Sequence, residues 1–105
     1  MTEYSKLTVT PGSEVSRFVK YSISYCEIEG DKVLREVWAL PDGAMWRRSI
    51  EWDFNEEPGS LRGGAPRPGP RWEQTSVEWS SQAEFEEMWS KAEWGPDAKS
   101  AMEGS

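Results

Sequence analysis

The sequence predicts an α+β domain in which an antiparallel meander of four or five strands carries one C-terminal helix on one face. A central hairpin is the first observation behind this prediction. Apolar residues alternate on both sides of Pro41-Asp42-Gly43 between positions 33 and 54, and a turn of this composition joins adjacent antiparallel strands. The chain has 105 residues, which is enough for one hydrophobic core and too few for a second.

The helix is the second observation. Ser81 and Glu84 have the spacing of a capping box, in which both side chains accept hydrogen bonds from backbone N–H groups at a helix start. Apolar residues follow at helical spacing, and Gly95-Pro96 is typical of a helix end. We therefore expect a helix from Ser81 to Trp94, whose sheet-facing stripe is Phe85, Met88, Trp89 and Ala92.

Two further strands complete the predicted sheet. From Arg17 onward, alternation places one apolar set on a single face: Val19, Tyr21, Ile23 and Tyr25. Residues 72–79 alternate in the same way directly before the helix. These elements form a single domain over residues 17–94, and residues 1–16 are expected to be either an edge strand or a mobile arm.

Proline and glycine interrupt the pattern in two places. Residues 55–71 contain four of the seven prolines and four of the nine glycines, which predicts a long, stiff loop rather than a helix or a central strand. Residues 95–105 are small and polar, and we expect a disordered tail there.

Composition argues against several classes of function. With 19 acidic and 12 basic residues the net charge is −7, so the surface repels phosphate backbones and nucleic acid is not an expected partner. The chain has no histidine and a single cysteine, Cys26, which argues against His-based triads, Cys/His dyads and most zinc sites. No segment has the pattern of a signal peptide or a membrane span. We expect a cytoplasmic protein with no cofactor and no membrane partner.

Six of the seven tryptophans divide into two groups. We expect four of them in the core between sheet and helix: Trp46, Trp52, Trp79 and Trp89. Trp38 and Trp72 fall on the opposite faces of their strands, and a tryptophan exposed near arginine is typical of a binding hot spot. The alternative is that the 55–71 loop covers both rings.

Charged residues supply the other candidate sites. Glu51 and Asp53 share one side of a strand, Glu56 and Glu57 follow it, and such a cluster pairs well with arginines of a partner. A solvated surface, a divalent-cation site and an acid–base pair are the alternatives, although the spacing matches no calcium loop. Candidate binders of phosphate or carboxylate groups are Arg47, Arg48, Arg62, Arg67 and Arg71.

Two segments carry a resemblance to known proteins. Val37–Arg47, which contains the hairpin turn, and Ser81–Ala92 together resemble a family of small uncharacterised bacterial proteins, some of which are thought to act as immunity proteins beside toxin genes. The resemblance covers under a quarter of the chain. Members of that family tend to have a histidine near the first strand, which this chain lacks, and no functional residue is carried over. The resemblance implies a binding protein.

We therefore expect a small acidic module that binds another protein with a basic surface and inhibits or neutralises it, as immunity or anti-defence proteins do. The predicted partner-binding residues are Glu51, Asp53, Glu56, Glu57, Trp38, Trp72, Arg62, Arg67 and Arg71. The alternative is a small-ligand-binding protein or minor enzyme with a tryptophan- and arginine-lined pocket under the 55–71 loop. A third class is a subunit of a larger assembly, and a homodimer is one such assembly.

Overall fold

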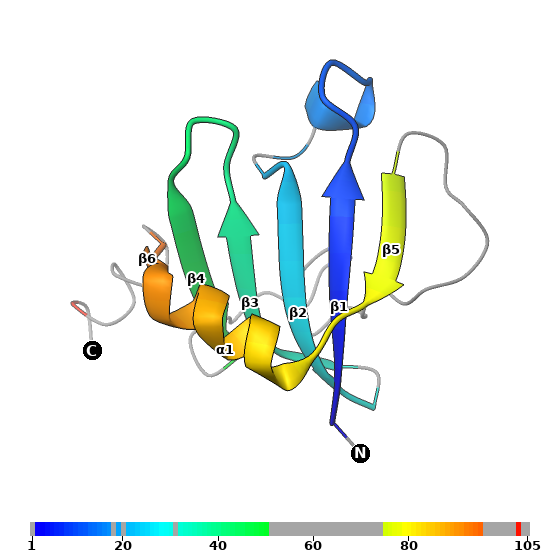
Figure 1. Cartoon of the computed structure of the whole chain (residues 1–105). Coiled ribbons are helices and arrows are strands. Elements are labelled where there is room, and N and C mark those ends of the chain that lie inside the picture. Colours follow the sequence, from blue (N-terminus) through cyan, green and yellow to red (C-terminus); the bar gives the residue numbers. More distant parts are fainter. Residues whose placement is uncertain are drawn as a thin grey trace.

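In the part of the chain that the structure describes, one six-stranded sheet carries a ten-residue helix on one face (Figure 1). The computed structural model describes residues 2–17, 19, 21–30, 32–50, 75–95 and 103. The strand order is β5-β1-β2-β3-β4-β6, and all neighbours are antiparallel except β4 and β6. The elements are β1 (Thr2–Val9), a 3-10 helix (Val15–Arg17), β2 (Ile23–Glu29), β3 (Lys32–Ala39), β4 (Met45–Ser49), β5 (Thr75–Trp79), α1 (Gln82–Lys91) and β6 (Glu93–Trp94). The predicted α+β class is confirmed, with more strands than predicted.

The N-terminal segment is an interior strand. β1 pairs with β2 on one side and with β5 on the other, and Ser5 and Val9 are buried. The prediction of an edge strand or mobile arm for residues 1–16 was therefore wrong. The strand that covers its second edge comes from 75–79, and a pairing across so long a stretch of chain leaves no local mark in the sequence.

The central hairpin is confirmed. The Leu40 N–H donates to the Ala44 carbonyl at 2.8 Å, and the Asp42 carboxylate accepts from the Ala44 N–H at 2.9 Å. Gly43 has φ 94°, a left-handed value that favours glycine. The turn fixes the register of the two strands, so that Trp38 lies opposite Trp46 and Glu36 opposite Arg48.

A bulge changes the faces of β3. Glu27 lies opposite Arg35, but the next residue, Ile28, lies opposite Val33, so one extra residue of β3 is left unpaired between them. Without the bulge, strict alternation would place Val33 and Val37 on the same face. Instead Val33 packs with Ile28 on one face, while Val37 lies on the other. β2 itself begins at Ile23, later than predicted.

The Ser81 half of the predicted capping box is confirmed, whereas Glu84 bonds a side-chain hydroxyl in place of a backbone N–H. The Ser81 hydroxyl accepts from the Glu84 N–H at 3.1 Å, while the Glu84 carboxylate accepts from the Ser80 hydroxyl. The helix ends at Lys91 rather than at Trp94, because Ala92 is already extended. The residues that follow form β6, which pairs in parallel with β4, and the Gly95 N–H donates to the Arg47 carbonyl at 3.2 Å.

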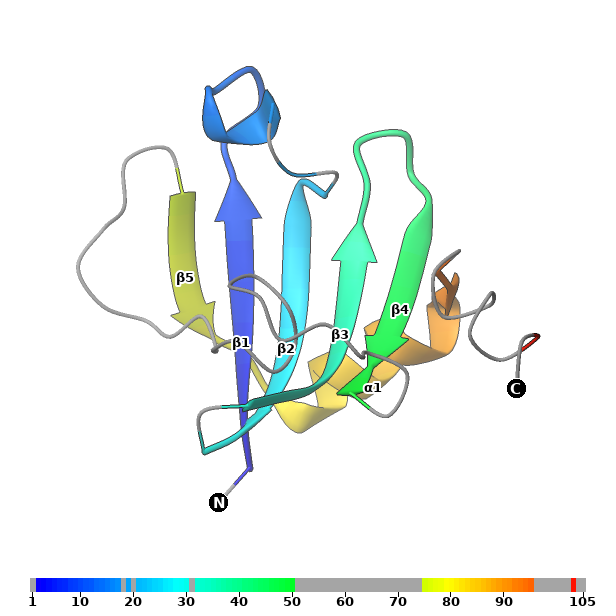
Figure 2. The same ribbon diagram turned by 180° about the vertical axis from the view of Figure 1, so that it is seen from behind.

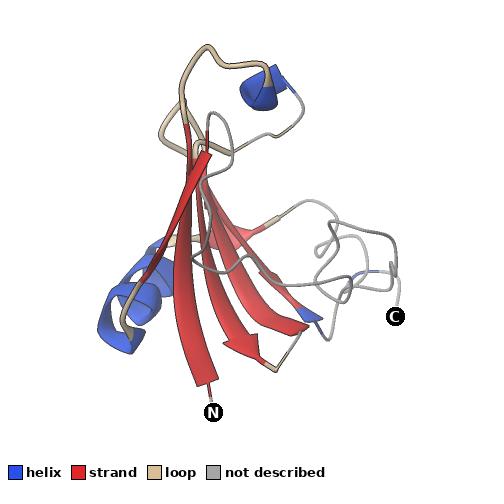
Figure 3. Cartoon of the chain, turned by 90° about the vertical axis from the view of Figure 1, so that its right-hand side faces the viewer, coloured by secondary structure: helices blue, strands red, loops and turns tan. Residues whose placement is uncertain are grey.

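Each face of the sheet has its own buried cluster. On the helix-side face, which α1 covers (Figure 3), the cluster is Tyr25, Val37, Phe85 and Ala92. On the opposite face, called the far face below, it is Cys26, Ile28 and Val33, with Ile50 packed against it. Figure 2 shows the sheet from this side, with α1 behind it. Because both faces of the sheet are covered at β2, this strand has apolar side chains on both of its sides.

The side chains of β4 and the tryptophans differ partly from expectation. Met45 and Arg47 lie under α1: Met45 packs on the helix-side core and Arg47 stacks on Trp89. Trp89 packs on this core as predicted. Trp46 instead lies on the far face opposite Trp38, and Trp79 is 50% exposed rather than buried. Trp52, the 55–71 loop and most of the 95–105 tail fall outside the described residues.

Candidate functional site

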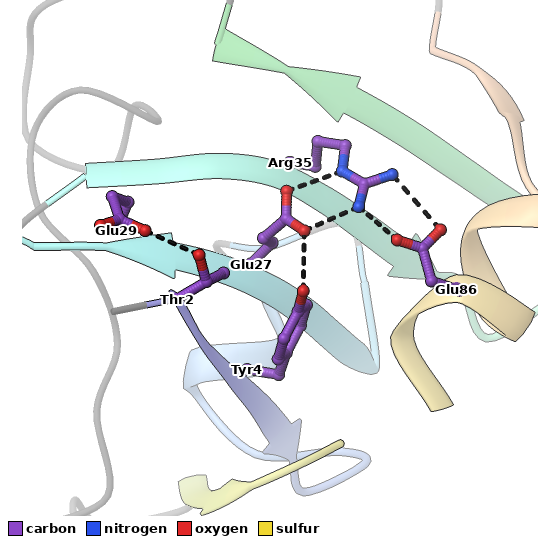
Figure 4. Close-up of polar contacts among 6 residues, drawn as sticks. All are labelled: Thr2, Tyr4, Glu27, Glu29, Arg35 and Glu86. Carbon is purple, nitrogen blue, oxygen red and sulfur yellow. Dashed lines mark hydrogen bonds and ion pairs between the residues drawn. The ribbon is translucent and has the colours of Figure 1, made fainter. Parts of the chain in front are cut away.

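Arg35 lies at the centre of a polar network between the sheet and α1 (Figure 4). Its Nε and Nη2 donate to the two carboxylate oxygens of Glu27, each at 2.7 Å, which makes a bidentate pair across β2 and β3. Nη2 and Nη1 also donate to the Glu86 carboxylate of α1, at 2.5 and 3.4 Å. The Tyr4 hydroxyl of β1 donates to Glu27 at 3.0 Å. A single guanidinium group therefore ties two strands to the helix.

These contacts set the charge states of the network. Hydrogen bonds from Arg35 lower the pKa of Glu27, although partial burial opposes them. Burial, together with the hydrogen bond to Glu27, raises the pKa of Tyr4. Nearby, Thr2 donates to Glu29 at 2.7 Å and lowers the pKa of that carboxyl (Figure 4). At neutral pH Glu27 is therefore ionised and the Tyr4 phenol is protonated.

Cation–π contacts extend the network onto the helix. The Arg35 guanidinium lies 5.0 Å from the Phe85 ring centroid and 4.9 Å from that of Trp89. Arg47 lies 5.1 Å from the Trp89 centroid and 4.8 Å from that of Trp94. Each contact of this kind contributes on the order of 1 kcal/mol. Because every group in it contacts another part of the same fold, this network is structural, and its role is to hold α1 on the sheet.

A second polar cluster surrounds Glu36 on the far face. Its carboxylate accepts from Arg48 Nη1 at 3.0 Å, from the Ser24 hydroxyl at 2.9 Å and from the Cys26 thiol at 3.6 Å. Arg48 also lies 4.8 Å from the ring centroid of Trp38. Tyr21 packs against the same indole, with ring centroids 5.1 Å apart. The cluster therefore joins a carboxyl group, a guanidinium, a thiol and two aromatic rings.

Burial is the largest influence on the pKa values of the acidic groups in this cluster. Desolvation raises the pKa of Glu36, with Arg48 as the main opposing influence. Burial, followed by the charge of Glu36, raises the pKa of the Cys26 thiol and raises that of Tyr21 to about 12. The free Cys26 thiol is buried, and its raised pKa makes it a poor nucleophile at neutral pH.

On the far face, two polar atoms are buried without a standard hydrogen bond in the part of the chain that the structure describes. They are the Ser5 hydroxyl and the Trp38 Nε1. Trp38 Nε1 lies close enough to the Glu36 carboxylate to lower its pKa, and the Ser5 hydroxyl does the same for the Cys26 thiol. Buried polar groups are normally paired, so these two atoms mark the far-face cluster as a place for a further polar contact.

The outer edge of β5 is the third candidate. Trp79 is 50% exposed, and within the described residues it is the one large apolar side chain with such exposure. It stands at the end of the edge strand, directly before α1. Residues 75–95, which form β5, α1 and β6, hold five acidic side chains and one basic side chain. An exposed indole in an acidic segment has the composition of a protein-binding surface.

Of the predicted partner-binding residues, the structure describes Trp38 alone. Trp38 lies half-buried on the far face, between Tyr21 and Arg48. The others lie outside the described residues: Glu51, Asp53, Glu56, Glu57, Trp72, Arg62, Arg67 and Arg71. Of the hairpin arginines proposed to bind anionic groups, Arg48 pairs with Glu36, a carboxyl of its own chain, while Arg47 stacks on tryptophans of α1 and β6.

Sequence reasoning missed the two Glu–Arg pairs. Glu36 and Arg48 lie at equal distances from the Pro41-Asp42-Gly43 turn, so the predicted hairpin already implied that they face each other. No comparable signal existed for Glu27 and Arg35, because the bulge shifts their register. Searched over the described residues, the structure shows no group of three acidic or cysteine side chains suited to a metal ion.

The described helices are too short or too polar to cross a bilayer. No protein-family model, no curated protein and no solved structure matches this chain.

Proposed function

We propose that this chain is a small acidic protein-binding module that inhibits or neutralises a partner protein with a basic surface. One observation carries the proposal: the half-exposed Trp79 stands on the edge strand β5, in a segment with five acidic residues and one basic residue. Residues 37–47 and 81–92 resemble a family of small uncharacterised bacterial proteins, some of which are thought to act as immunity proteins, and this resemblance supports the same interpretation.

The physical argument combines steering with anchoring. A surface of one charge sign accelerates encounter with a partner of the opposite sign, and the effect weakens as salt screens the charges. An exposed tryptophan supplies a large apolar area that becomes buried on binding, and truncation of such an anchor commonly costs about 2 kcal/mol or more. The acidic group at Glu51, Asp53, Glu56 and Glu57 would add to the steering field, and this stays a prediction.

The test begins with capture of partners from the native host by the full-length protein, followed by mass spectrometry. A captured protein is then purified, and its association rate is measured at increasing salt with three variants: Trp79→Ala, Glu78→Lys and Glu14→Lys. The last two change the net charge equally, but Glu14 lies in the loop after β1, at the opposite end of the sheet from Trp79 (Figure 1).

We expect binding to weaken about thirtyfold in Trp79→Ala, in line with loss of an interface anchor. Association should slow at low salt in Glu78→Lys and much less in Glu14→Lys. Charge reversal at Glu51 and Asp53 is expected to slow it as well. An association rate indifferent to salt, or binding untouched by Trp79→Ala, would contradict the proposal.

The far-face cluster supports a second candidate, a small-ligand-binding protein or minor enzyme. The observation in its favour is the buried Trp38 Nε1, which makes no standard hydrogen bond within the described residues and lies beside Arg48 and Glu36. Its test is a screen of anionic metabolites by tryptophan fluorescence. Saturable quenching that disappears in Trp38→Phe would support this candidate, whereas quenching that survives this substitution would count against it.

A further inference from the structure

The outer edge of β5 has backbone groups that face outward. The Ser80 N–H donates to the Tyr4 carbonyl at 2.8 Å, and Glu78 lies opposite Lys6 in the same register. In an antiparallel ladder the backbone groups of alternate residues point to opposite sides. Those of Ser80 and Glu78 point toward β1, so those of Val77 and Trp79 point away from it. Among the strands that the structure describes, β5 pairs only with β1.

The side chains of this edge are sorted by face. Val77 lies opposite Leu7, and Trp79 opposite Ser5, so both belong to the far face. Glu78 lies opposite Lys6 and belongs to the helix-side face, and so does Ser76. A strand added at this edge would therefore meet apolar side chains on one face and a hydroxyl and a carboxylate on the other.

The edge also lacks several of the features that usually protect an edge strand. Proteins often block such strands with proline, bulges or lysine side chains. Thr75–Trp79 contains no proline or lysine, and its register with β1 runs without a shift. Its last residue is instead the exposed Trp79. An edge with unblocked backbone groups and an exposed indole is suited to pairing with another extended segment.

We propose, as a refinement that rests on the proposed function, that the partner contributes an extended segment which pairs with the outer edge of β5 as an additional strand. In this segment apolar side chains alternate with lysine or arginine. The apolar set packs beside Val77 and Trp79 on the far face, and the basic set lies beside Glu78 on the helix-side face. Backbone hydrogen bonds supply affinity, and the two faces supply selectivity.

Charge argues against a second copy of this chain as the occupant. Pairing of two β5 edges would bring together two segments that each hold five acidic residues and one basic residue, in chains of net charge −7. Like charges placed across a sheet are destabilising, whereas a basic segment gains from the same field. A basic partner segment therefore fits this edge better.

The test uses the full-length chain and a synthetic acetylated, amidated peptide of about seven residues in which lysine and valine alternate. Its matched controls are a peptide of the same composition with the lysines in one block, and an alternating glutamate–valine peptide. Binding is measured by the tryptophan fluorescence of the protein. N-methylation at each peptide position then tests the backbone hydrogen bonds, because alternate N–H groups should face β5.

We expect saturable binding of the lysine–valine peptide and weaker binding of both controls. N-methylation at alternate positions should weaken binding about tenfold, and at the intervening positions by less than about twofold. Val77→Pro removes an outward N–H while leaving the bonds to β1 in place, so it should abolish binding without unfolding the protein. Should Val77→Pro fail to fold, Glu78→Lys provides the second variant, with an expected loss of about tenfold against about twofold for Glu14→Lys.

Equal effects of N-methylation at all positions, or equal binding of all three peptides, would overturn the proposed strand pairing. So would sedimentation showing a dimer that Val77→Pro dissociates, because the occupant would then be a second copy. If a captured partner binds in a salt-dependent way that Trp79→Ala weakens but Val77→Pro leaves unchanged, the protein-binding function stands and only the strand pairing fails. If no partner binds while the peptide does, the failure lies with the proposed function.

Discussion

The two faces of the sheet each hold a glutamate and an arginine on directly opposed strand positions, and the two pairs behave differently. Glu27 and Arg35 join β2 to β3 on the helix-side face, and Glu36 and Arg48 join β3 to β4 on the far face. The two carboxylates keep nearly equal exposed fractions, 11% and 12%. Yet the pKa of Glu27 is lowered and that of Glu36 is raised.

The difference shows that exposed area alone does not determine the charge state of a paired carboxylate. Glu27 receives two guanidinium hydrogen bonds of 2.7 Å in fork geometry and a third bond from Tyr4. Glu36 receives one guanidinium bond of 3.0 Å, and its other contacts are with neutral groups: a hydroxyl, a thiol and the Trp38 indole. On the far face desolvation outweighs this weaker set of contacts. Bidentate geometry decides the outcome on the helix-side face.

The largest expected change in the free energy of unfolding comes from removing the Phe85 ring, which packs against the Glu27–Arg35 pair. Phe85 is fully buried and lies beneath the Arg35 guanidinium. Phe85→Ala should lower the free energy of unfolding by about 3–5 kcal/mol, because it opens a cavity under α1. Denaturant unfolding measures this change, and Ala83→Ser, an exposed position on the same helix, is the matched control. A cost near that of the control would show that α1 does not anchor this face.

The next effect compares the two arginines directly. Arg35→Met keeps much of the side-chain packing but leaves Glu27 and Glu86 without their cation. We expect a loss of about 2–3 kcal/mol in unfolding free energy. Arg48→Met should cost about half as much, because Glu36 receives a single guanidinium bond and desolvation already raises its pKa. Lys91→Ala, which breaks an exposed pair with Glu87, serves as the control at about 0.3–0.5 kcal/mol. If Arg48→Met lowered the unfolding free energy more than Arg35→Met, the proposed difference between the two Glu–Arg pairs would be wrong.

The smallest effect is on the pH dependence of stability, where the two glutamates should act in opposite directions. The lowered pKa of Glu27 adds stability above its unfolded value of about 4.5, and this stability is lost as the pH falls through the folded value. The raised pKa of Glu36 has the reverse sign: stability is fully present at acid pH and declines as the pH rises from about 4.5 through the folded value.

Unfolding free energies measured between about pH 3 and pH 8 separate the two contributions. In Glu27→Gln, the unfolding free energy should fall less than in the unsubstituted protein as the pH drops. In Glu36→Gln, it should fall less as the pH rises toward neutral. Glu14→Gln, at an exposed loop position, controls for the loss of one carboxylate. If both substitutions changed the pH profile in the same direction, the proposed contrast between the faces would be wrong.

Local rules predicted those parts of the fold whose cause lies within a few residues. The capping serine, the apolar helix stripe and the hairpin turn were all predicted, because hydrogen bonds between near neighbours decide them. The same hairpin register places Glu36 opposite Arg48, so one of the two Glu–Arg pairs could have been predicted from the turn alone. The candidate site was less predictable. Trp79 was expected in the core, and only its place on the edge strand leaves it exposed.

The sequence by itself determined the α+β class, the hairpin and the helix, since periodicity and turn chemistry act over short distances. Tertiary structure decided the contacts between residues far apart in the sequence. These contacts are the pairing of β5 with β1, the pairing of β6 with β4, and the packing of the helix on one face of the sheet. It also placed the bulge that turns Arg35 toward Glu27. One extra residue in a strand moves every later side chain of that strand to the opposite face of the sheet. The position of this residue depends on packing against both faces of the sheet and not on local composition.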